Sequence, residues 1–221
     1  MPKLADRRGL MLLAWVNVAL HGLALLLAVA GVRPGSPLAP LHDRLEYLAS
    51  YPLGWLLGWG AWMLCTLALI AFFAAVAHYL PEWPSLSRLA VVLAAAGGSL
   101  DLFCDVLYIT VLPSLAAQTP VSEATFLAFE RAANAGGLIV ANGLYATGVL
   151  LLTACLREFR ASERWVIPTG YAVFAFGMIL VVAGFLDAPR LAAIGTVPTI
   201  GSYCLWTILV ARSLGSVECP P

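Results

Sequence analysis

The chain has few charged residues and no excess of either sign. Only 11% of its 221 residues are Asp, Glu, Lys or Arg, whereas a soluble globular domain carries about 25%. Lys and Arg total 12 and Asp and Glu total 12, so there is no basic surplus to bind a phosphate backbone. We therefore expect neither a soluble domain nor a nucleic-acid partner.

Sequence motifs of several enzyme classes are also missing. There is no Gly-x-Ser-x-Gly elbow, phosphate loop or dinucleotide fingerprint. The three histidines, His21, His42 and His78, lie on different segments, and a zinc site needs three or four ligands. The cysteines at 65, 104, 155, 204 and 219 form no Cys-x-x-Cys pair, so we expect them to be small packing residues. The sequence predicts no cofactor and no bound metal.

Long hydrophobic runs dominate the chain. It is 62% hydrophobic, with a mean hydropathy of +0.91. A membrane-spanning helix needs about 20 mostly apolar residues, and such runs occur at about 9–31, 52–80, 89–113, 136–156, 167–186 and 191–214. They are twice as long as the strands of a membrane barrel. The sequence predicts an all-α, polytopic transmembrane bundle, in which six transmembrane helices form a single domain over 1–221 with the lipid bilayer as first partner.

Positive charge predicts the orientation. One predicted face carries eight Lys and Arg (Lys3, Arg7, Arg8, Arg88, Arg157, Arg160, Arg164, Arg212), and the other carries four (Arg33, Arg44, Arg131, Arg190). The richer face is cytoplasmic by the positive-inside rule, so we expect both termini inside. The first run is too long for a signal-peptide core, and we expect it to be a retained span. Eleven arginines against one lysine, with abundant Ala, Gly and Leu, are typical of a GC-rich bacterial gene, which indicates the inner (plasma) membrane.

Two segments outside the spans have helical amphipathic patterns. Leu41, Leu45 and Leu48 recur at helical spacing within about 38–49, which predicts a helix lying on the outer membrane surface. A second surface helix is predicted over 121–133, before the fourth span. Trp55 and Trp59, at the start of the second span, are expected in the interfacial aromatic belt.

Small residues mark predicted packing seams between the spans. Gly170, Gly177 and Gly184 repeat every seven residues in the fifth span, and Gly54 and Gly58 form a Gly-xxx-Gly pair in the second. Such spacings let neighbouring helix backbones approach closely.

Polar residues recur within the spans, where a carboxylate costs about 2.5–3.5 kcal/mol on insertion scales. Asp101 and Asp105 stand one turn apart on one face of the third span. Counted at 1.5 Å per residue, polar faces of the first, third, fourth and sixth spans fall at one depth. We expect an outward-facing polar pocket whose ligand-binding residues are His21, Asp101, Asp105, Tyr108, Asn134, Asn142, Tyr145 and Ser202.

A structural role for some of these residues stays open. Buried polar groups in membranes also bind helices to one another, at about 0.6 kcal/mol each. We favour this interpretation for Asn17, Asn134 and Asn142, and leave His21 open between the two roles. The two aspartates repel each other when both are charged, which favours a functional role such as proton coupling, cation binding or recognition of a polar ligand.

Gly97, Asp101 and Asp105 form a pattern that resembles half of a known enzyme signature. It is similar to the second part of the motif of the CDP-alcohol phosphatidyltransferases, membrane enzymes that hold two metals with four aspartates. The first part of that motif is replaced here by His-Tyr-Leu-Pro-Glu-Trp-Pro at 78–84, which has no aspartate. That family's site also opens to the cytoplasm, whereas Asp105 is expected to point outward. We therefore do not expect this activity.

The layout as a whole resembles families of uncharacterised six-span bacterial integral membrane proteins. The resemblance lies in a Gly- and Leu-rich fourth span, in an inner loop with Arg157, Arg160 and Arg164, and in the Pro-Thr-Gly entry to the fifth span at 168–170. It implies the six-span fold and no particular activity.

We expect a protein that binds, senses or transports a small polar or cationic species through the pocket. Six spans are few for a secondary transporter unless it forms a homo-oligomer. Two alternatives stay open: an intramembrane enzyme acting on a lipid-like substrate, and a structural or accessory subunit of a membrane complex.

Overall fold

The computed structural model describes residues 4–80, 82–158 and 164–215, and all regular elements in these ranges are helices, with no strand among them. Six of the helical segments are long and apolar enough to cross a membrane: Arg8–Gly35, Leu53–His78, Pro84–Ala116, Glu123–Arg157, Val166–Phe185 and Pro189–Gly215. They agree with the six predicted runs. The fold is therefore the predicted all-helical arrangement.

Several of these segments join shorter helices end to end. The first combines α1 (Leu4–Leu27), the π-helix η1 (Ala28–Val32) and the 3-10 turn η2 (Arg33–Gly35). The short α2 (Leu41–Ala49) precedes α3 (Leu53–His78). The third segment combines α4 (Pro84–Val106), the π-helix η3 (Leu107–Val111) and α5 (Leu112–Ala116). The fourth combines α6 (Glu123–Asn134), the π-helix η4 (Ala135–Ala141) and α7 (Asn142–Arg157), and α8 (Val166–Phe185) and α9 (Pro189–Gly215) follow.

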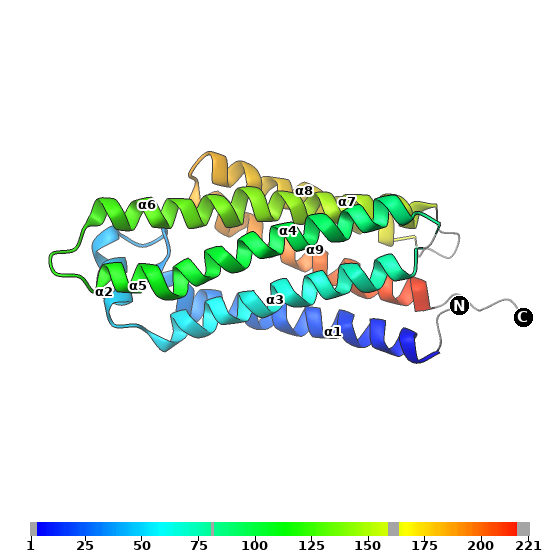
Figure 1. Ribbon diagram of the computed structural model, residues 1–221, viewed down its shortest axis with the longest axis horizontal. Coiled ribbons are helices and arrows are strands. Elements are labelled where there is room, and N and C mark those ends of the chain that lie inside the picture. The colour runs from blue at the N-terminus through cyan, green and yellow to red at the C-terminus, as the bar shows by residue number, and fades with distance from the viewer. Residues whose placement is uncertain (1–3, 81, 159–163, 216–221) are drawn as a thin grey trace, which may run out of the picture.

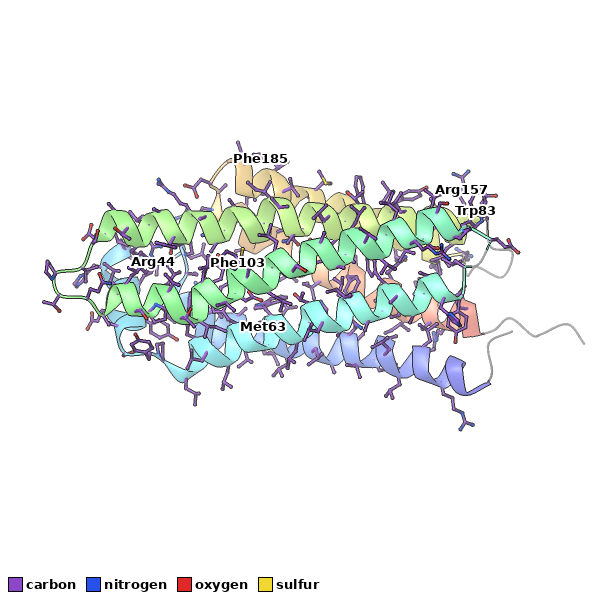
Figure 2. The ribbon with its side chains drawn as sticks, in the orientation of Figure 1. Arg44, Met63, Trp83, Phe103, Arg157 and Phe185 are labelled. Carbon is purple, nitrogen blue, oxygen red and sulfur yellow. The ribbon has the colours of Figure 1, made fainter. Side chains whose placement is uncertain are left out.

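The six long segments form a closed ring. Each packs against its neighbours in the order α1, α3, α4, α7, α8 and α9, and α9 returns to α1. Successive segments run in opposite directions, so α1 begins and α9 ends at the same end of the bundle (Figure 1). We call this the terminal end, and the opposite end, which carries α2, α5 and α6, the capped end. Arg157 and Trp83 lie at the terminal end and Arg44 at the capped end (Figure 2).

The two amphipathic segments pack against other parts of the chain. The helix α2 packs against α5 and η2 at the capped end, where Arg44, Leu45 and Leu48 are buried. The segment predicted over 121–133 forms α6, which continues without a break through η4 into α7. The apolar face of each segment packs against protein, and α6 is part of a long helical segment rather than a separate surface helix. The place of α2 at a membrane surface stays a prediction.

The two central segments are longer than a bilayer requires. Pro84–Ala116 has 33 residues and Glu123–Arg157 has 35, which correspond to about 50 Å of helix, against a hydrocarbon thickness of about 30 Å. They extend beyond the other helices at the capped end, and α2 lies beside their extension (Figure 1). The capped end therefore projects from the membrane if the rest of the bundle spans it.

The interior of the ring is filled at the terminal end. Phe72, Phe73 and Trp206 are fully buried there, within a cluster that takes residues from all six long segments. The three glycines of the predicted seam in α8 face α7 and η4, where an added Cβ would lie 2.1 Å from Thr153 Oγ1, 2.9 Å from Ala146 Cβ and 2.6 Å from Ile139 Cγ1. These distances confirm the packing seam that the seven-residue repeat predicts.

Candidate functional site

A cavity of about 610 Å³ lies inside the ring, toward the capped end. All six long segments contribute to its lining, as does the loop that follows η2. Each of the three π-helices adds lining residues: Val29 from η1, Tyr108 from η3 and Leu138 from η4. A π-turn widens a helix locally and is frequent at functional sites. The interior of the ring therefore has two parts: the cavity toward the capped end and the packed aromatic cluster at the terminal end.

The cavity brings together seven of the eight predicted site residues. They are His21, Asp101, Asp105, Tyr108, Asn134, Asn142 and Tyr145. Ser202 does not line it, because the face of α9 toward the cavity carries Thr196, Thr199 and Tyr203, and Ser202 lies beside that face. The Ser202 hydroxyl donates instead to the carbonyls of Pro198 and Thr199 in its own helix, at 2.7 and 3.0 Å. Its assignment to the pocket is therefore wrong.

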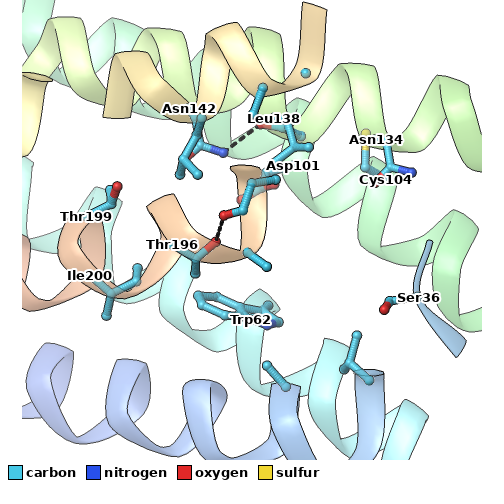
Figure 3. A pocket seen from close by; sticks show the side chains of 18 of the residues that line it. Ser36, Trp62, Asp101, Cys104, Asn134, Leu138, Asn142, Thr196, Thr199 and Ile200 are labelled. Carbon is cyan, nitrogen blue, oxygen red and sulfur yellow. Dashed lines mark hydrogen bonds between the residues drawn. The ribbon is translucent and has the colours of Figure 1, made fainter. Parts of the chain in front are cut away.

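Asp101 is held by two hydroxyl donors. Its Oδ2 accepts hydrogen bonds from Thr66 of α3 at 2.9 Å and from Tyr145 of α7 at 3.1 Å. Both donors come from helices that flank α4 in the ring. Asp101 thereby links three helices, and its side chain points into the cavity, toward the space that Trp62 also borders (Figure 3). A carboxylate fixed in this way presents its charge in a defined place.

Asp105 has no comparable partner. Its side chain lines the cavity and the residue is only 2% exposed. Its buried Oδ2 has no hydrogen-bond partner among the described residues. Burial of a carboxylate without a hydrogen bond or counter-charge costs several kcal/mol. Asp105 is therefore costly to bury as a carboxylate, and an additional partner in the cavity would stabilise it.

His21 borders the cavity from α1. Its Nδ1 lies 2.8 Å from the Asn17 backbone oxygen, and because a carbonyl only accepts, this nitrogen carries the proton. In a neutral ring Nε2 is then an acceptor. The ring lies against Tyr203, with centroids 5.1 Å apart, and meets the edge of Trp62 at 6.3 Å. The interpretation of His21 as a cavity residue is compatible with these contacts.

Tryptophans of α3 form an aromatic wall. Trp55, Trp59 and Trp62 occur at helical spacing and all line the cavity. Trp59 stacks on Tyr108, with centroids 3.8 Å apart and an interplanar angle of 5°, and Trp55 donates its indole N–H to the Tyr108 carbonyl at 2.7 Å. Trp55 is 1% exposed. The assignment of Trp55 and Trp59 to an interfacial belt is therefore wrong, because both rings pack inside the bundle.

The three asparagines play different parts. Asn134 accepts a hydrogen bond from the Tyr108 hydroxyl at 2.8 Å and lines the cavity. Asn142 donates to the Gly137 carbonyl of η4 at 2.8 Å and points toward the same space (Figure 3). Asn17 is outside the cavity, where it donates to the Ala68 carbonyl at 3.1 Å and accepts from Tyr203 at 3.0 Å. Asn17 is thus the interhelical link that the sequence analysis favours, and Asn134 combines such a link with a place in the wall. The Asn142 hydrogen bond stays within its own helical segment, so it is not an interhelical link.

A buried ion pair joins α2 to the cavity. Arg44 of α2 donates to Glu130 of α6, whose side chain lines the cavity, and the two residues are 7% and 4% exposed. Nearby, the Tyr47 hydroxyl donates to the Gly31 carbonyl at 2.6 Å. Burial raises the pKa of Tyr47, so its hydroxyl keeps its proton at neutral pH. These contacts fix α2 at the capped end of the cavity.

Several cavity residues lack a strong signal in the sequence. Thr66 and Trp62 lie in the most apolar part of α3 and look like membrane-facing residues when read alone. The recurrence of Trp55, Trp59, Trp62 and Thr66 on one face was the available signal. It is ambiguous because aromatic residues at a span end are also typical of the membrane interface.

The arrangement suits a cation with an organic body. One side of the cavity carries Asp101 and Asp105, and aromatic rings of Trp59, Trp62 and Tyr145 lie around it. Aromatic faces attract cations, and a carboxylate supplies the counter-charge. Among the described residues no group of three or more His, Cys, Asp or Glu side chains is placed to hold a metal ion. The cavity volume falls in the range of about 300–1,000 Å³ typical of small-molecule sites.

Comparison of this chain with protein-family models, with curated proteins and with solved structures finds no match.

Proposed function

We propose that this protein is a multi-pass protein of the bacterial inner membrane that binds a small organic ammonium cation in the cavity. Asp105 carries the proposal: its buried carboxylate oxygen has no partner among the described residues, and it lines a cavity whose wall also includes Asp101 and several aromatic rings. A bound ammonium group would supply the missing counter-charge. Cation–π contacts with the rings would add about 0.5–2 kcal/mol.

The proposed orientation places the terminal end in the cytoplasm. Arg88, Arg157 and Arg212 belong to the terminal end, and Arg33, Arg44 and Arg131 belong to the capped end. Two of the positive residues counted in the sequence, Lys3 and Arg160, lie outside the described residues. With this orientation the cavity opens on the outer side of the membrane. The packed cluster around Phe72, Phe73 and Trp206 separates it from the cytoplasm.

Ligand capture from outside is thus the step that the arrangement supports best. Sensing and transport both require it as their first event. Transport additionally requires the aromatic cluster at the terminal end to open, so the binding step can be tested by itself.

The test is equilibrium binding of choline to the purified protein in nanodiscs. Choline carries a permanent charge, and 3,3-dimethylbutan-1-ol is its uncharged carbon analogue. The tryptophans that line the cavity give a fluorescence readout. We expect saturable binding of choline and at least tenfold weaker binding of the alcohol, because only the charged ligand pairs with the carboxylates.

Two variants make the assignment specific. Asp105→Asn keeps the shape of the side chain and removes its charge, and we expect it to weaken choline binding about 30-fold or more. Asp43→Asn removes an exposed carboxylate of α2 that does not line the cavity, and we expect unchanged binding. Equal affinity for choline and its neutral analogue, or equal affinity of wild type and Asp105→Asn, would contradict the proposal.

A further inference from the structure

The cavity has a second opening, which faces the side of the bundle. Val29 of η1 and Val197 of α9 line the cavity and are nevertheless 67% and 62% exposed. A residue that lines a cavity and is also exposed on the outer surface marks a place where the two meet. The cavity therefore reaches the lateral surface between the first and last long segments.

The contacts between α1 and α9 explain where this opening lies. Tyr203 of α9 donates to Asn17 of α1 at 3.0 Å and its ring lies against His21, which joins the helices at that level. Further toward the capped end, the cavity separates them. Apart from Thr196, its lining there is apolar: Leu25, Ala28 and Val29 on one side and Ala193, Val197 and Ile200 on the other.

The opening would lie at the depth of lipid acyl chains in a bilayer whose outer hydrocarbon edge is at the start of α9. Val197 is eight residues from the start of α9 at Pro189, which places it about 12 Å below that end of the helix. Half of the hydrocarbon thickness is about 15 Å. A groove at this level would face lipid rather than water.

We infer that the ligand of this cavity is a single-chain ammonium amphiphile, with its head at Asp101 and Asp105 and its alkyl chain leaving between Val29 and Val197 into the outer leaflet. The inference rests on the proposed function and adds the chemical class of the ligand. Charge complementarity selects the head and the apolar lateral groove selects the tail. The volume of about 610 Å³ suits one compact head and the start of one chain.

The experiment compares tetramethylammonium, butyltrimethylammonium and octyltrimethylammonium binding to the protein in phosphatidylglycerol nanodiscs, whose lipid has no ammonium group. Partition into the bilayer raises the apparent affinity of long chains equally for all variants. The informative quantity is therefore the octyl-to-methyl affinity ratio of each variant relative to wild type.

Substitutions at the groove have matched controls on the same segments. Val197→Trp and Val29→Trp each place a large ring in the opening, whereas Ile194→Trp and Leu26→Trp place it at positions that are 73% and 71% exposed and do not line the cavity. Each buried methylene contributes up to about fourfold in affinity. We expect the groove variants to lower the octyl-to-methyl ratio about tenfold and the control variants to leave it within twofold.

The outcomes separate the two proposals. If no ammonium ion binds in an Asp105-dependent way, the proposed function fails. If tetramethylammonium binds and requires Asp105, but groove and control variants have the same ratio as wild type, the lateral-groove inference alone fails. Addition of phosphatidylethanolamine to the nanodiscs tests whether a two-chain membrane lipid can supply the ammonium head group instead. If phosphatidylethanolamine displaces octyltrimethylammonium that is present at trace concentration, the assignment of a single-chain ligand is overturned.

Discussion

Asp101 and Asp105 stand one turn apart on α4 and differ in their partners: Asp101 Oδ2 accepts hydrogen bonds from Thr66 and Tyr145, and the buried Asp105 Oδ2 accepts none from the described residues. Two aspartates one helical turn apart thus have different roles. Asp101 ties helices together and defines the wall of the cavity. Asp105 is kept buried without a compensating contact, which is typical of a functional group retained at a cost in stability.

This contrast predicts opposite effects on stability. Asp101→Ala leaves the hydroxyls of Thr66 and Tyr145 without their acceptor and should cost about 1–3 kcal/mol. Asp105→Asn removes a buried carboxyl group whose Oδ2 has no partner among the described residues, so the free energy of unfolding should stay the same or rise. Unfolding in mixed micelles without added ligand measures both variants. A loss of about 2 kcal/mol in Asp105→Asn would show that this side chain belongs to a structural network.

The approach of η1 to α3 predicts a position that tolerates no side chain. A Cβ on Gly31 would lie 2.2 Å from the Gly54 carbonyl oxygen, which belongs to the backbone of α3 and cannot move aside as the end of a flexible side chain can. Gly31→Ala should therefore destabilise the protein by about 1–3 kcal/mol. Gly22→Ala is the matched control on the same long segment, because a Cβ there meets nothing within 4 Å. Comparable melting temperatures for the two variants would contradict the predicted clash.

The spans were predictable because hydropathy alone decides them. The second run, predicted over 52–80, is α3 over Leu53–His78, and the fifth, predicted over 167–186, is α8 over Val166–Phe185. The shared depth of His21, Asp101 and Tyr145 was also predictable, since helical rise converts sequence position into depth. The ring of six antiparallel helices then brings these three side chains to the same interior space.

Other features depend on packing that a single sequence does not reveal. Glu130 and Arg131 gave α6 the charge pattern of a surface helix, although Glu130 is paired inside with Arg44 and only Arg131 is exposed. Trp55 is a residue type typical of the membrane interface and lies at the start of a predicted span, yet its indole N–H donates to the backbone carbonyl of Tyr108 in η3. In both cases the partner comes from a distant segment, and local periodicity contains no information about it.

The Arg44–Glu130 ion pair predicts a strong dependence on both partners. Arg44→Met alone leaves Glu130 buried and unpaired, which should cost about 3–5 kcal/mol, whereas Arg44→Met combined with Glu130→Met should recover most of that loss. The Arg131–Asp187 pair is the control: its atoms are 3.7 Å apart and its side chains are 70% and 73% exposed. Arg131→Met should change stability by less than about 1 kcal/mol. A double-mutant cycle for each pair, measured by denaturant unfolding, separates the coupling energies.

The proposed orientation predicts which end of the bundle meets the outside of the cell. Gln118, between α5 and α6, is exposed at the capped end, and Ser85, in the first turn of α4, is exposed at the terminal end. In a variant whose five native cysteines are replaced by alanine, Gln118→Cys should react with a membrane-impermeant maleimide on spheroplasts with an intact inner membrane. Ser85→Cys should react only after that membrane is permeabilised. The reverse pattern would place the cavity opening toward the cytoplasm, and a ligand would then have to arrive from the cytoplasm or the inner leaflet.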